Sequence, residues 1–273
     1  VAHEYLGGIP QLPPIVPRPL GPGGAPVDEL TYYSGRAEDP SGSPIFYAYL
    51  LDVAMGRGAE RASLIGRRMV DLSGAGLGVV RLLAGAGVDA MGVFGDPQAR
   101  LLYSQPSDQG VVPLYGREVT GRVSLAFGAF PTDAATVAAV SYGYDLAISR
   151  NALKRGLVRP ADAPAGAPSL LGLPDEEYLK RLWTLLKPGG RMLVYNLCPA
   201  PNPVGGPSNP GADCRSPFSQ AQWQGAGFRV RDFDRSDTPD VRTVAKALGW
   251  DQGAGRIDVD TNLFAIYTLV ERP

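Results

Sequence analysis

The sequence predicts an α/β fold in which a mostly parallel sheet is covered by helices on both faces. From residue 67 onward, short apolar runs typical of buried strands alternate with stretches in which apolar residues recur at helical spacing. Turns rich in glycine or proline separate these stretches. Alternation at this rhythm indicates βαβ units, and therefore a parallel sheet.

The first half of the chain contains four expected strands and the helices between them. One helix begins at Asp96 as its N-cap, with Pro97 at its first position. An earlier helix over 45–54, IFYAYLLDVA, is expected to pack on the sheet with its tyrosines in the core. The expected strands cover 67–73, 88–94, 121–128 and 144–149, and the expected helices between them cover 77–87, 96–104 and 132–140.

The second half continues the alternation. Pro174 and three acidic residues open a helix, where the macrodipole favours negative charge, and KPGG at 187–190 stops it. The long irregular segment 198–217 is of a kind that is usually functional or disordered. The expected helices cover 174–186, 219–227 and 237–250, and the expected strands cover 191–197, 228–234 and 262–272.

Residues 1–44 are expected to form an arm outside the main domain. The arm is rich in proline and glycine, which favours extended, polyproline-like backbone draped over a surface. Since no internal repeat and no linker divides the remainder, we expect one domain over 45–273.

Composition excludes several classes of function. The formal net charge of the 273 residues is -1, with no basic stripe, which argues against nucleic acid as a partner. No apolar run approaches the ~20 residues that a membrane-spanning helix needs. His3 is the single histidine, so histidine-based triads and zinc sites are not expected, and we predict no metal. The nucleophile-elbow motif GxSxG is also absent.

The two cysteines, Cys198 and Cys214, lie in the same irregular segment and lack the CxxC spacing of a zinc or redox motif. They can form a disulfide only if the chain is exported. The cytoplasm is favoured, and an exported form whose signal peptide has been removed stays open.

The stretch MVDLSGAGLGVV at 69–80 is the strongest candidate for a ligand-binding turn. In open parallel sheets, ligands bind beyond the carboxyl ends of the strands, and this turn follows the first expected strand. Its glycines, Gly74, Gly76 and Gly78, have GxGxG spacing, whereas a dinucleotide site has GxGxxG, so a nicotinamide oxidoreductase is disfavoured. The alternative is that these glycines only allow tight strand-to-helix packing.

The order of the motifs resembles class I S-adenosylmethionine-dependent methyltransferases from residue 45 to the C-terminus. VDLSGAGLG stands at the position of their first glycine motif, VDAMGVFGDPQA at their second strand, and GAFPTD near their adenine loop. YDLAISRN resembles their fourth strand, LWTLLKPGGRMLVYN their PGG turn and fifth strand, and WQGAGFRVRDFD with NLFAIYTLV their closing antiparallel pair. The resemblance implies a Rossmann-like sheet of seven strands, with the last strand antiparallel, and S-adenosylmethionine as cofactor.

The resemblance also implies roles for individual residues. Asp71 would lie beneath the methionine end of the cofactor, and the second strand would end beside its ribose. Ala129 and Phe130 would flank the adenine, and Ser149 and Arg150 would face both cofactor and substrate. The implied cofactor-binding set is Asp71, Ser73, Gly74, Ala75, Gly76, Phe94, Gly95, Asp96, Ala129, Phe130, Ser149 and Arg150.

Two departures from the family pattern leave a second hypothesis open. The positions where the family has its three glycines hold Ser73, Ala75 and Leu77, and the ribose acid Asp96 comes only after Phe94 and Gly95. The pocket would then be remodelled, binding another small ligand or catalysing a reaction other than methylation. The first hypothesis requires an open hollow beside the turn, so Leu77 or Phe94 filling that hollow would count against it.

The expected reaction is methyl transfer to a small, rather apolar molecule. Alignment of the acceptor and exclusion of water contribute most to such a displacement, and the base is Asp, Glu, Lys or Tyr because histidine is lacking. Asn151, Lys154, Tyr195 and Asn196 are the catalytic candidates, since they follow the fourth and fifth expected strands. A solvated helix position for Lys154 and a loop-capping role for Asn196 are the alternatives. Tyr32 and Tyr33, with the loop 197–217, could form a lid over the substrate.

Overall fold

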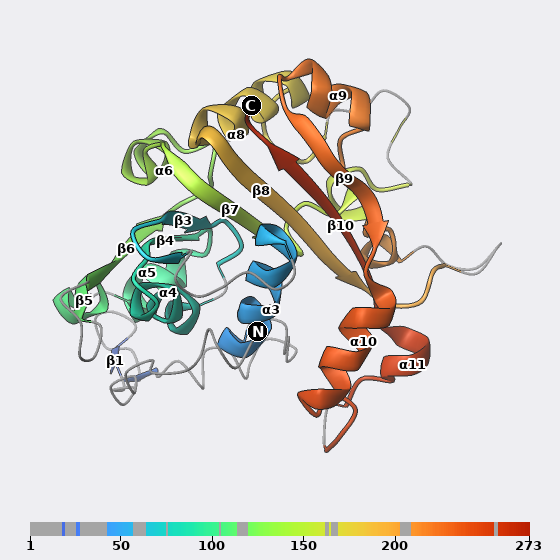
Figure 1. Ribbon diagram of the computed structural model, residues 1–273, viewed down its shortest axis with the longest axis horizontal. Helices are drawn as coiled ribbons and strands as arrows, with labels where there is room; N and C mark the ends of the chain where they lie inside the picture. The colour runs from blue at the N-terminus through green and yellow to red at the C-terminus, as the bar shows by residue number, and fades with distance from the viewer. Residues whose placement is uncertain are drawn as a thin grey trace. The chain divides into compact units, whose positions relative to one another are not determined.

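The computed structural model in Figure 1 describes most of the chain between residue 43 and the C-terminus. The chain divides into two compact units, Val1–Leu146 and Ala147–Pro273, called here the first and second units. The described residues are 18–19, 26–27, 43–56, 64–74, 76–103, 105–113, 120–161, 164, 169–202, 209–253 and 256–273. Most of the predicted arm, including Tyr32 and Tyr33, lies outside this set.

The sheet of the first unit is parallel except at its edge. Strand β3 (Arg68–Asp71) pairs parallel with β4 (Asp89–Phe94), and β4 pairs parallel with β6 (Thr120–Phe127). Strand β5 (Gly110–Pro113), which the sequence does not predict, is antiparallel to β6. The parallel pairing places the carboxyl ends of β3, β4 and β6 at one edge of the sheet, as the sequence predicts.

The helices of the first unit begin at residues suited to their positions. Ser43 caps α3 by accepting a hydrogen bond from the amide of Phe46, and Asp133 caps α6 in the same way with the amide of Thr136. The apolar residues of α4, among them Val80 and Leu83, are buried where the helix packs on β4 and β6. The helices are α3 (Pro44–Met55), α4 (Leu77–Gly85), α5 (Pro97–Leu102) and α6 (Ala134–Val140).

Strand β7 (Tyr144–Arg150) begins in the first unit and ends in the second. The second unit continues with β8 (Leu186–Cys198), β9 (Arg229–Ser236) and β10 (Phe264–Glu271). β10 lies between β8 and β9 and is antiparallel to both. The strand order is β5-β6-β4-β3-β7-β8-β10-β9 in a mixed, mostly parallel sheet surrounded by helices. The α/β prediction with an antiparallel last strand is confirmed, and β5 brings the strands of this sheet, among the described residues, to eight where seven were expected.

The KPGG segment differs from its prediction. The sequence predicts a turn between helix and strand, but β8 starts at Leu186, directly after α8 (Asp175–Leu185), and includes these residues. Gly189 donates its amide to the carbonyl of Arg272 (2.7 Å), and the amide of Arg272 donates to Gly190 (2.9 Å). The segment therefore extends the pairing beside β10.

The remaining helices of the second unit cover the positions predicted for them, together with two short additions. Ser219 and Gln222 form a capping box at the start of α9, and Trp223 of that helix is fully buried against Phe218 and Phe228. The helices are α7 (Arg155–Val158), α9 (Gln220–Gly225), α10 (Thr238–Ala247) and α11 (Val259–Asn262), of which α7 and α11 are not predicted by the sequence. Within the described part of the chain, no helix is long and apolar enough to cross a membrane.

Candidate functional site

The turn after β3 is held by a buried carboxylate. Asp71 is 1% exposed, and its Oδ1 accepts hydrogen bonds from the hydroxyl of Tyr47 (2.8 Å) and from the amide of Ser73 (3.3 Å). Tyr47 lies on α3 and is completely buried, in agreement with the core position predicted for the tyrosines of that helix. Asp71 therefore fixes the path of the backbone as it leaves the strand.

The glycines of this turn are required by backbone conformation. Gly74 has φ +64° and Gly76 has φ +107°, in the region that L side chains rarely adopt. Gly76 is the N-cap of α4 and offers no side-chain oxygen, while the next amide, that of Leu77, donates to the hydroxyl of Tyr103 at 3.4 Å. Ala75 lies outside the described residues.

The space beside the turn is occupied by aromatic side chains. Phe94 is 3% exposed, and its ring centroid lies 5.2 Å from that of Tyr103 and 5.8 Å from that of Phe127. A Cβ placed on Gly74 would lie 3.7 Å from Cδ1 of Phe94. Leu77 is also only 3% exposed. Phe94 therefore packs against the turn where it meets β4, and this packing favours the remodelled pocket.

The edge beyond Phe94 is open. Gly95 is exposed, and a Cβ on it would meet nothing within 4 Å, while Asp96 is half-buried. The amide of Gly128 donates to the carbonyl of Phe94 (2.9 Å), which brings the loop after β6 to this edge. In that loop Ala129 is exposed and Phe130 is half-buried. Four residues of the predicted cofactor set thus follow paired parallel strands at the same edge of the sheet, Gly95 and Asp96 after β4 and Ala129 and Phe130 after β6.

In the second unit, Asn151 connects the ends of β7 and β8. It has φ +59°, donates its amide to the carbonyl of Tyr195 (3.0 Å), and accepts from the amide of Leu197 at its Oδ1 (2.8 Å). Ser149 and Arg150 at the end of β7 are 1% and 8% exposed. The side chain of Asn151 is thus engaged in joining two strands.

Tyr195 and Asn196 are buried and engaged within the second unit. The hydroxyl of Tyr195 donates to Asp237 Oδ2 (2.8 Å), and its ring stacks on Tyr267 with the centroids 6.3 Å apart. The Nδ2 of Asn196 donates to the carbonyls of Leu153 (2.9 Å) and Cys214 (3.0 Å). The Oδ1 of Asn196 and the Oγ of Ser149 are buried without a hydrogen-bond partner. Asn196 therefore bonds to the loop that follows β8, which is the loop-capping role given above as the alternative to catalysis. Its Oδ1 is an acceptor without a partner.

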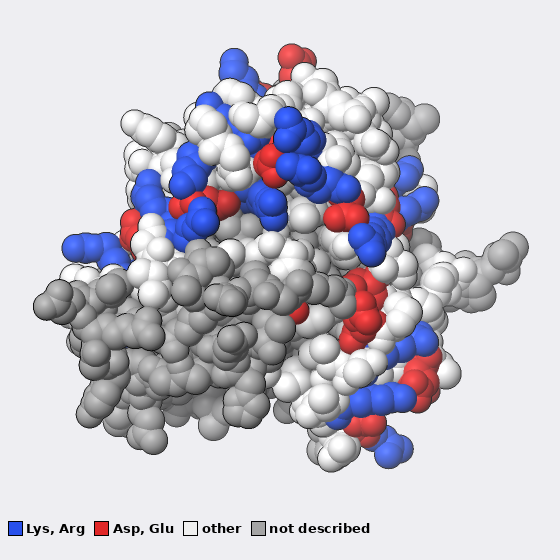
Figure 2. Space-filling model, viewed as in Figure 1, with Lys and Arg blue, Asp and Glu red and all other residues white. Residues whose placement is uncertain are grey.

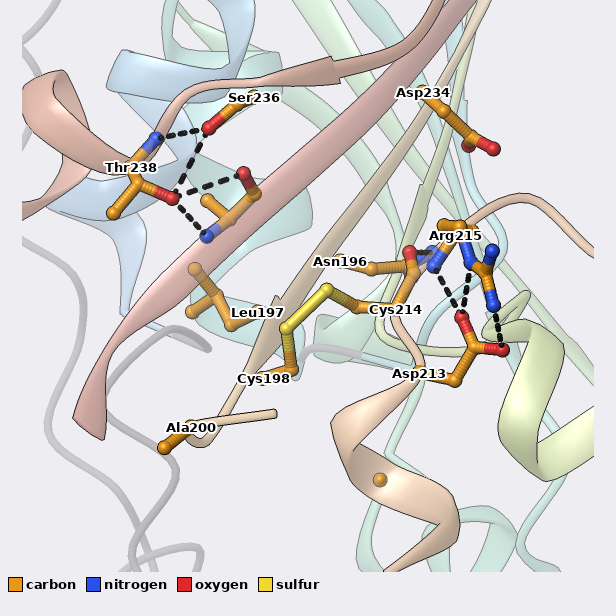
Figure 3. Close-up of a disulfide and its surroundings, with 12 residues drawn as sticks. Asn196, Leu197, Cys198, Ala200, Asp213, Cys214, Arg215, Asp234, Ser236 and Thr238 are labelled. Atoms are coloured by element: carbon orange, nitrogen blue, oxygen red, sulfur yellow. Dashed lines mark hydrogen bonds and ion pairs between the residues drawn. A yellow bond between two sulfur atoms is a disulfide. The ribbon is translucent and has the colours of Figure 1, made fainter. Parts of the chain in front are cut away.

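Cys198 and Cys214 form a disulfide at the end of β8 (Figure 3). Both are buried, and the segment beside Cys214 is further held because Gly156 donates to the carbonyl of Asp213 (3.0 Å) and Arg155 to that of Arg215 (2.9 Å). A hydrogen bond from Arg215 holds the pKa of the Asp213 carboxyl below its ordinary value. Lys154, half-buried, is the N-cap of α7 beside this segment.

The sequence does not predict the positioning role of three residues: Tyr47, Tyr103 and Asp237. Their hydrogen-bond partners lie 24, 26 and 42 residues away in the chain, so no local spacing reveals these bonds. The described residues hold no group of His, Cys, Asp and Glu that could bind a metal ion.

Comparison with known proteins gives similarity in architecture only. No protein-family model and no curated protein matches the chain. Geranyl diphosphate methyltransferase has a TM-score of 0.45 and 14% identity over 84% of this chain and 77% of that chain. The cyclase SpnF has a TM-score of 0.40 and 16% identity over 77% of this chain and 75% of that chain. A SAM-dependent methyltransferase from Methanosarcina mazei has a TM-score of 0.39 and 14% identity over 76% of this chain and 92% of that chain.

The fold is Rossmann-like. Strands β3, β4 and β6 are parallel, a glycine turn precedes α4, and the antiparallel β10 lies between β8 and β9.

Proposed function

We propose that the chain transfers a methyl group from S-adenosylmethionine to a small, rather apolar molecule. The observation that supports this most is the edge of the first unit where Gly95 and Asp96 follow β4 and Ala129 and Phe130 follow the neighbouring parallel strand β6. An exposed glycine allows a nucleoside to come close, a carboxylate can accept hydrogen bonds from its ribose hydroxyls, and an apolar pair can contact its adenine.

The residues present fit the cofactor at this edge and fit it less well at the turn. A Cβ on Gly95 would meet nothing within 4 Å, which leaves room for a ligand next to the half-buried Asp96, the residue proposed to accept from ribose hydroxyls. Beside Gly74 the ring of Phe94 packs at 3.7 Å from an added Cβ, so less room is left there. When bound, S-adenosylmethionine would supply a sulfonium methyl for in-line displacement.

Among the four catalytic candidates, Lys154 is proposed as the base when the acceptor is a hydroxyl. Asn151 and Asn196 hold the ends of β7 and β8, and the hydroxyl of Tyr195 donates to buried Asp237. These three act by positioning. Lys154 is half-buried at the N-cap of α7, and a lysine side chain can act as a general base.

A second candidate function is favoured by the packing of Phe94 and Tyr103. Their rings pack against each other next to the turn that the first hypothesis needs to be open, and the Tyr103 hydroxyl accepts from the amide at the start of α4. In this alternative, the methyltransferase-like fold binds another small ligand or catalyses a reaction other than methylation.

Titration of the full chain with S-adenosylhomocysteine distinguishes the two. Methyl transfer predicts saturable binding by calorimetry and stabilisation by about 2.7 kcal/mol at a ligand concentration of 100 Kd. Asp96→Asn should weaken binding, whereas Glu177→Gln, which neutralises an exposed carboxylate on α8, should not. Absence of binding at millimolar ligand would favour the second function. The mass of any copurifying small molecule would then identify its ligand class, and titration with NAD tests the oxidoreductase hypothesis.

We further propose that the chain occupies an oxidising compartment. The Cys198–Cys214 disulfide supports this, because cytoplasmic thiols are kept reduced. Of the two compartments left open by the sequence, the disulfide favours export, and because S-adenosylmethionine is an intracellular cofactor, an exported chain would support the second function. Alkylation of protein taken directly from its native source tests this: unblocked thiols would place the chain in a reducing compartment.

A further inference from the structure

A cluster of arginines surrounds one carboxylate on the sheet of the second unit. Glu271 of β10 is 7% exposed and accepts from Arg231 at both carboxylate oxygens, with Nη2–Oε1 at 2.8 Å and Nε–Oε2 at 3.1 Å. Arg229 Nη1 lies 3.2 Å from Oε1, and Arg191 Nε lies 3.4 Å from Oε2. These four residues are called here the arginine cluster.

The sheet register places the cluster on one face. Arg191 of β8 and Arg229 of β9 are both directly opposite Glu271. Met192 and Val270, which alternate with them, point to the other face and are buried. The arginine side chains are 36–56% exposed, and Figure 2 shows Lys and Arg side chains gathered over β8, β9 and β10.

The charges in the cluster do not balance. Arg229 and Arg231 alone bring two positive charges to one carboxylate, and Arg191 also contacts it. The hydrogen bond from Arg231 lowers the pKa of Glu271, so this carboxyl stays ionised at neutral pH. Elsewhere on β9, Arg235 lies 2.8 Å from Asp232. Arg229 and Arg231, by contrast, share the single negative charge of Glu271.

We propose that the arginine cluster binds a phosphate group, either free or carried by a small molecule. Planar guanidinium groups present N–H pairs that match the oxygens of phosphate, and they bind it more strongly than a point charge does. Arg229 is the most exposed of the three and makes a single hydrogen bond to Glu271, so its other N–H groups face solvent. Glu271 neutralises only one of the guanidinium groups, and an added phosphate relieves the repulsion that remains among them.

Calorimetric titration of the full chain with inorganic phosphate and with phenyl phosphate tests the proposal, at ionic strength held constant with chloride. We expect saturable binding of inorganic phosphate, of phenyl phosphate, or of both. Tighter binding of inorganic phosphate would indicate free phosphate as the ligand, and tighter binding of phenyl phosphate would indicate a phosphate ester. Arg229→Gln should weaken binding by about tenfold, the effect of losing one charge-assisted hydrogen bond. Arg181→Gln, which breaks an exposed pair with Glu177 on α8, should leave it unchanged.

Glu271→Gln separates a binding site from a structural clamp. Removing the carboxylate charge raises the net positive charge, so phosphate should bind this variant more tightly than the natural chain, provided circular dichroism shows it folded. If Glu271→Gln is not folded, the Arg229→Gln comparison alone decides. The proposal is overturned if neither phosphate binds beyond the chloride control, if Arg229→Gln binds as well as the natural chain, or if folded Glu271→Gln binds more weakly.

Discussion

The hydroxyl of Tyr47 on α3 donates to Asp71 at the end of β3 over 2.8 Å, although 24 residues separate the two. Both are buried, so this bond fixes the start of the glycine turn from the neighbouring helix. Replacing Tyr47 with Phe leaves the buried carboxylate with one donor fewer.

For Tyr47→Phe we therefore expect a loss of about 1–3 kcal/mol in the free energy of unfolding. Urea unfolding should show a lower midpoint at an unchanged m-value. Tyr142→Phe is the matched control, because Tyr142 is 68% exposed and should change the midpoint little. Equal midpoints for the two variants would show that Asp71 does not depend on Tyr47.

Phe94→Ala should both destabilise the first unit and open the space beside Gly74. Removal of a buried phenylalanine costs about 3–5 kcal/mol, whereas Leu170→Ala, at a side chain that is 71% exposed, should cost little. In the folded variant, calorimetry should show S-adenosylhomocysteine binding at least as tightly as to the natural chain. A folded variant that loses binding would mean that the ring itself contacts the nucleoside.

Reduction of the Cys198–Cys214 disulfide should lower stability by about 2–4 kcal/mol, the usual effect of opening a loop of this size. The two cysteines are 16 residues apart in the chain. Chemical unfolding with and without reductant measures the effect. The double variant Cys198→Ser, Cys214→Ser should have the same unfolding free energy with and without reductant. If reductant leaves the stability of the natural chain unchanged, the prediction is wrong.

Stability should fall at alkaline pH because of two buried tyrosines. Burial raises the pKa of Tyr178 from its ordinary value of 10.0 to about 12, and that of Tyr144 also to about 12. The unfolded chain releases these protons first, so their contribution is complete below pH 10 and is lost as pH rises from about 10 to 12.

The Tyr178 contribution is at most about 2–3 kcal/mol, the equivalent of a shift of two pKa units. Tyr178→Phe should flatten the decline in unfolding free energy between pH 10 and 12, while Tyr142→Phe, in the exposed position, should follow the natural chain. An unchanged slope in Tyr178→Phe would show that this tyrosine does not titrate abnormally.

Much of the fold could be predicted from the sequence because periodicity and capping act locally. Asp133 begins its helix inside the predicted 132–140 stretch, and β7 covers the predicted 144–149 strand. β5 was missed because its four residues end in proline and carry too short a pattern to read as a strand. The extension of β8 over KPGG depends on hydrogen bonds to Arg272. Arg272 lies 82 residues after Gly190 and 83 after Gly189, so no local pattern predicts the pairing.

The candidate site was less predictable, since its decisive contacts join different elements. The motifs place Gly95 and Asp96 after the second strand, and their assignment to ribose stays a prediction. That Phe94 turns its ring toward Tyr103 and Phe127 follows from packing between β4, α5 and β6. The spacing of residues in the sequence does not predict whether a buried aromatic ring occupies the space beside the turn or leaves it open.

The position of β10 between β8 and β9 has a consequence for biosynthesis. During translation, β9 emerges from the ribosome with no neighbour to pair with until residues 264–271 have followed it. For that interval both β8 and β9 expose unpaired backbone edges, which are sites of aggregation. A ribosome stalled before residue 264 would therefore hold a nascent chain that depends on chaperones to stay monomeric.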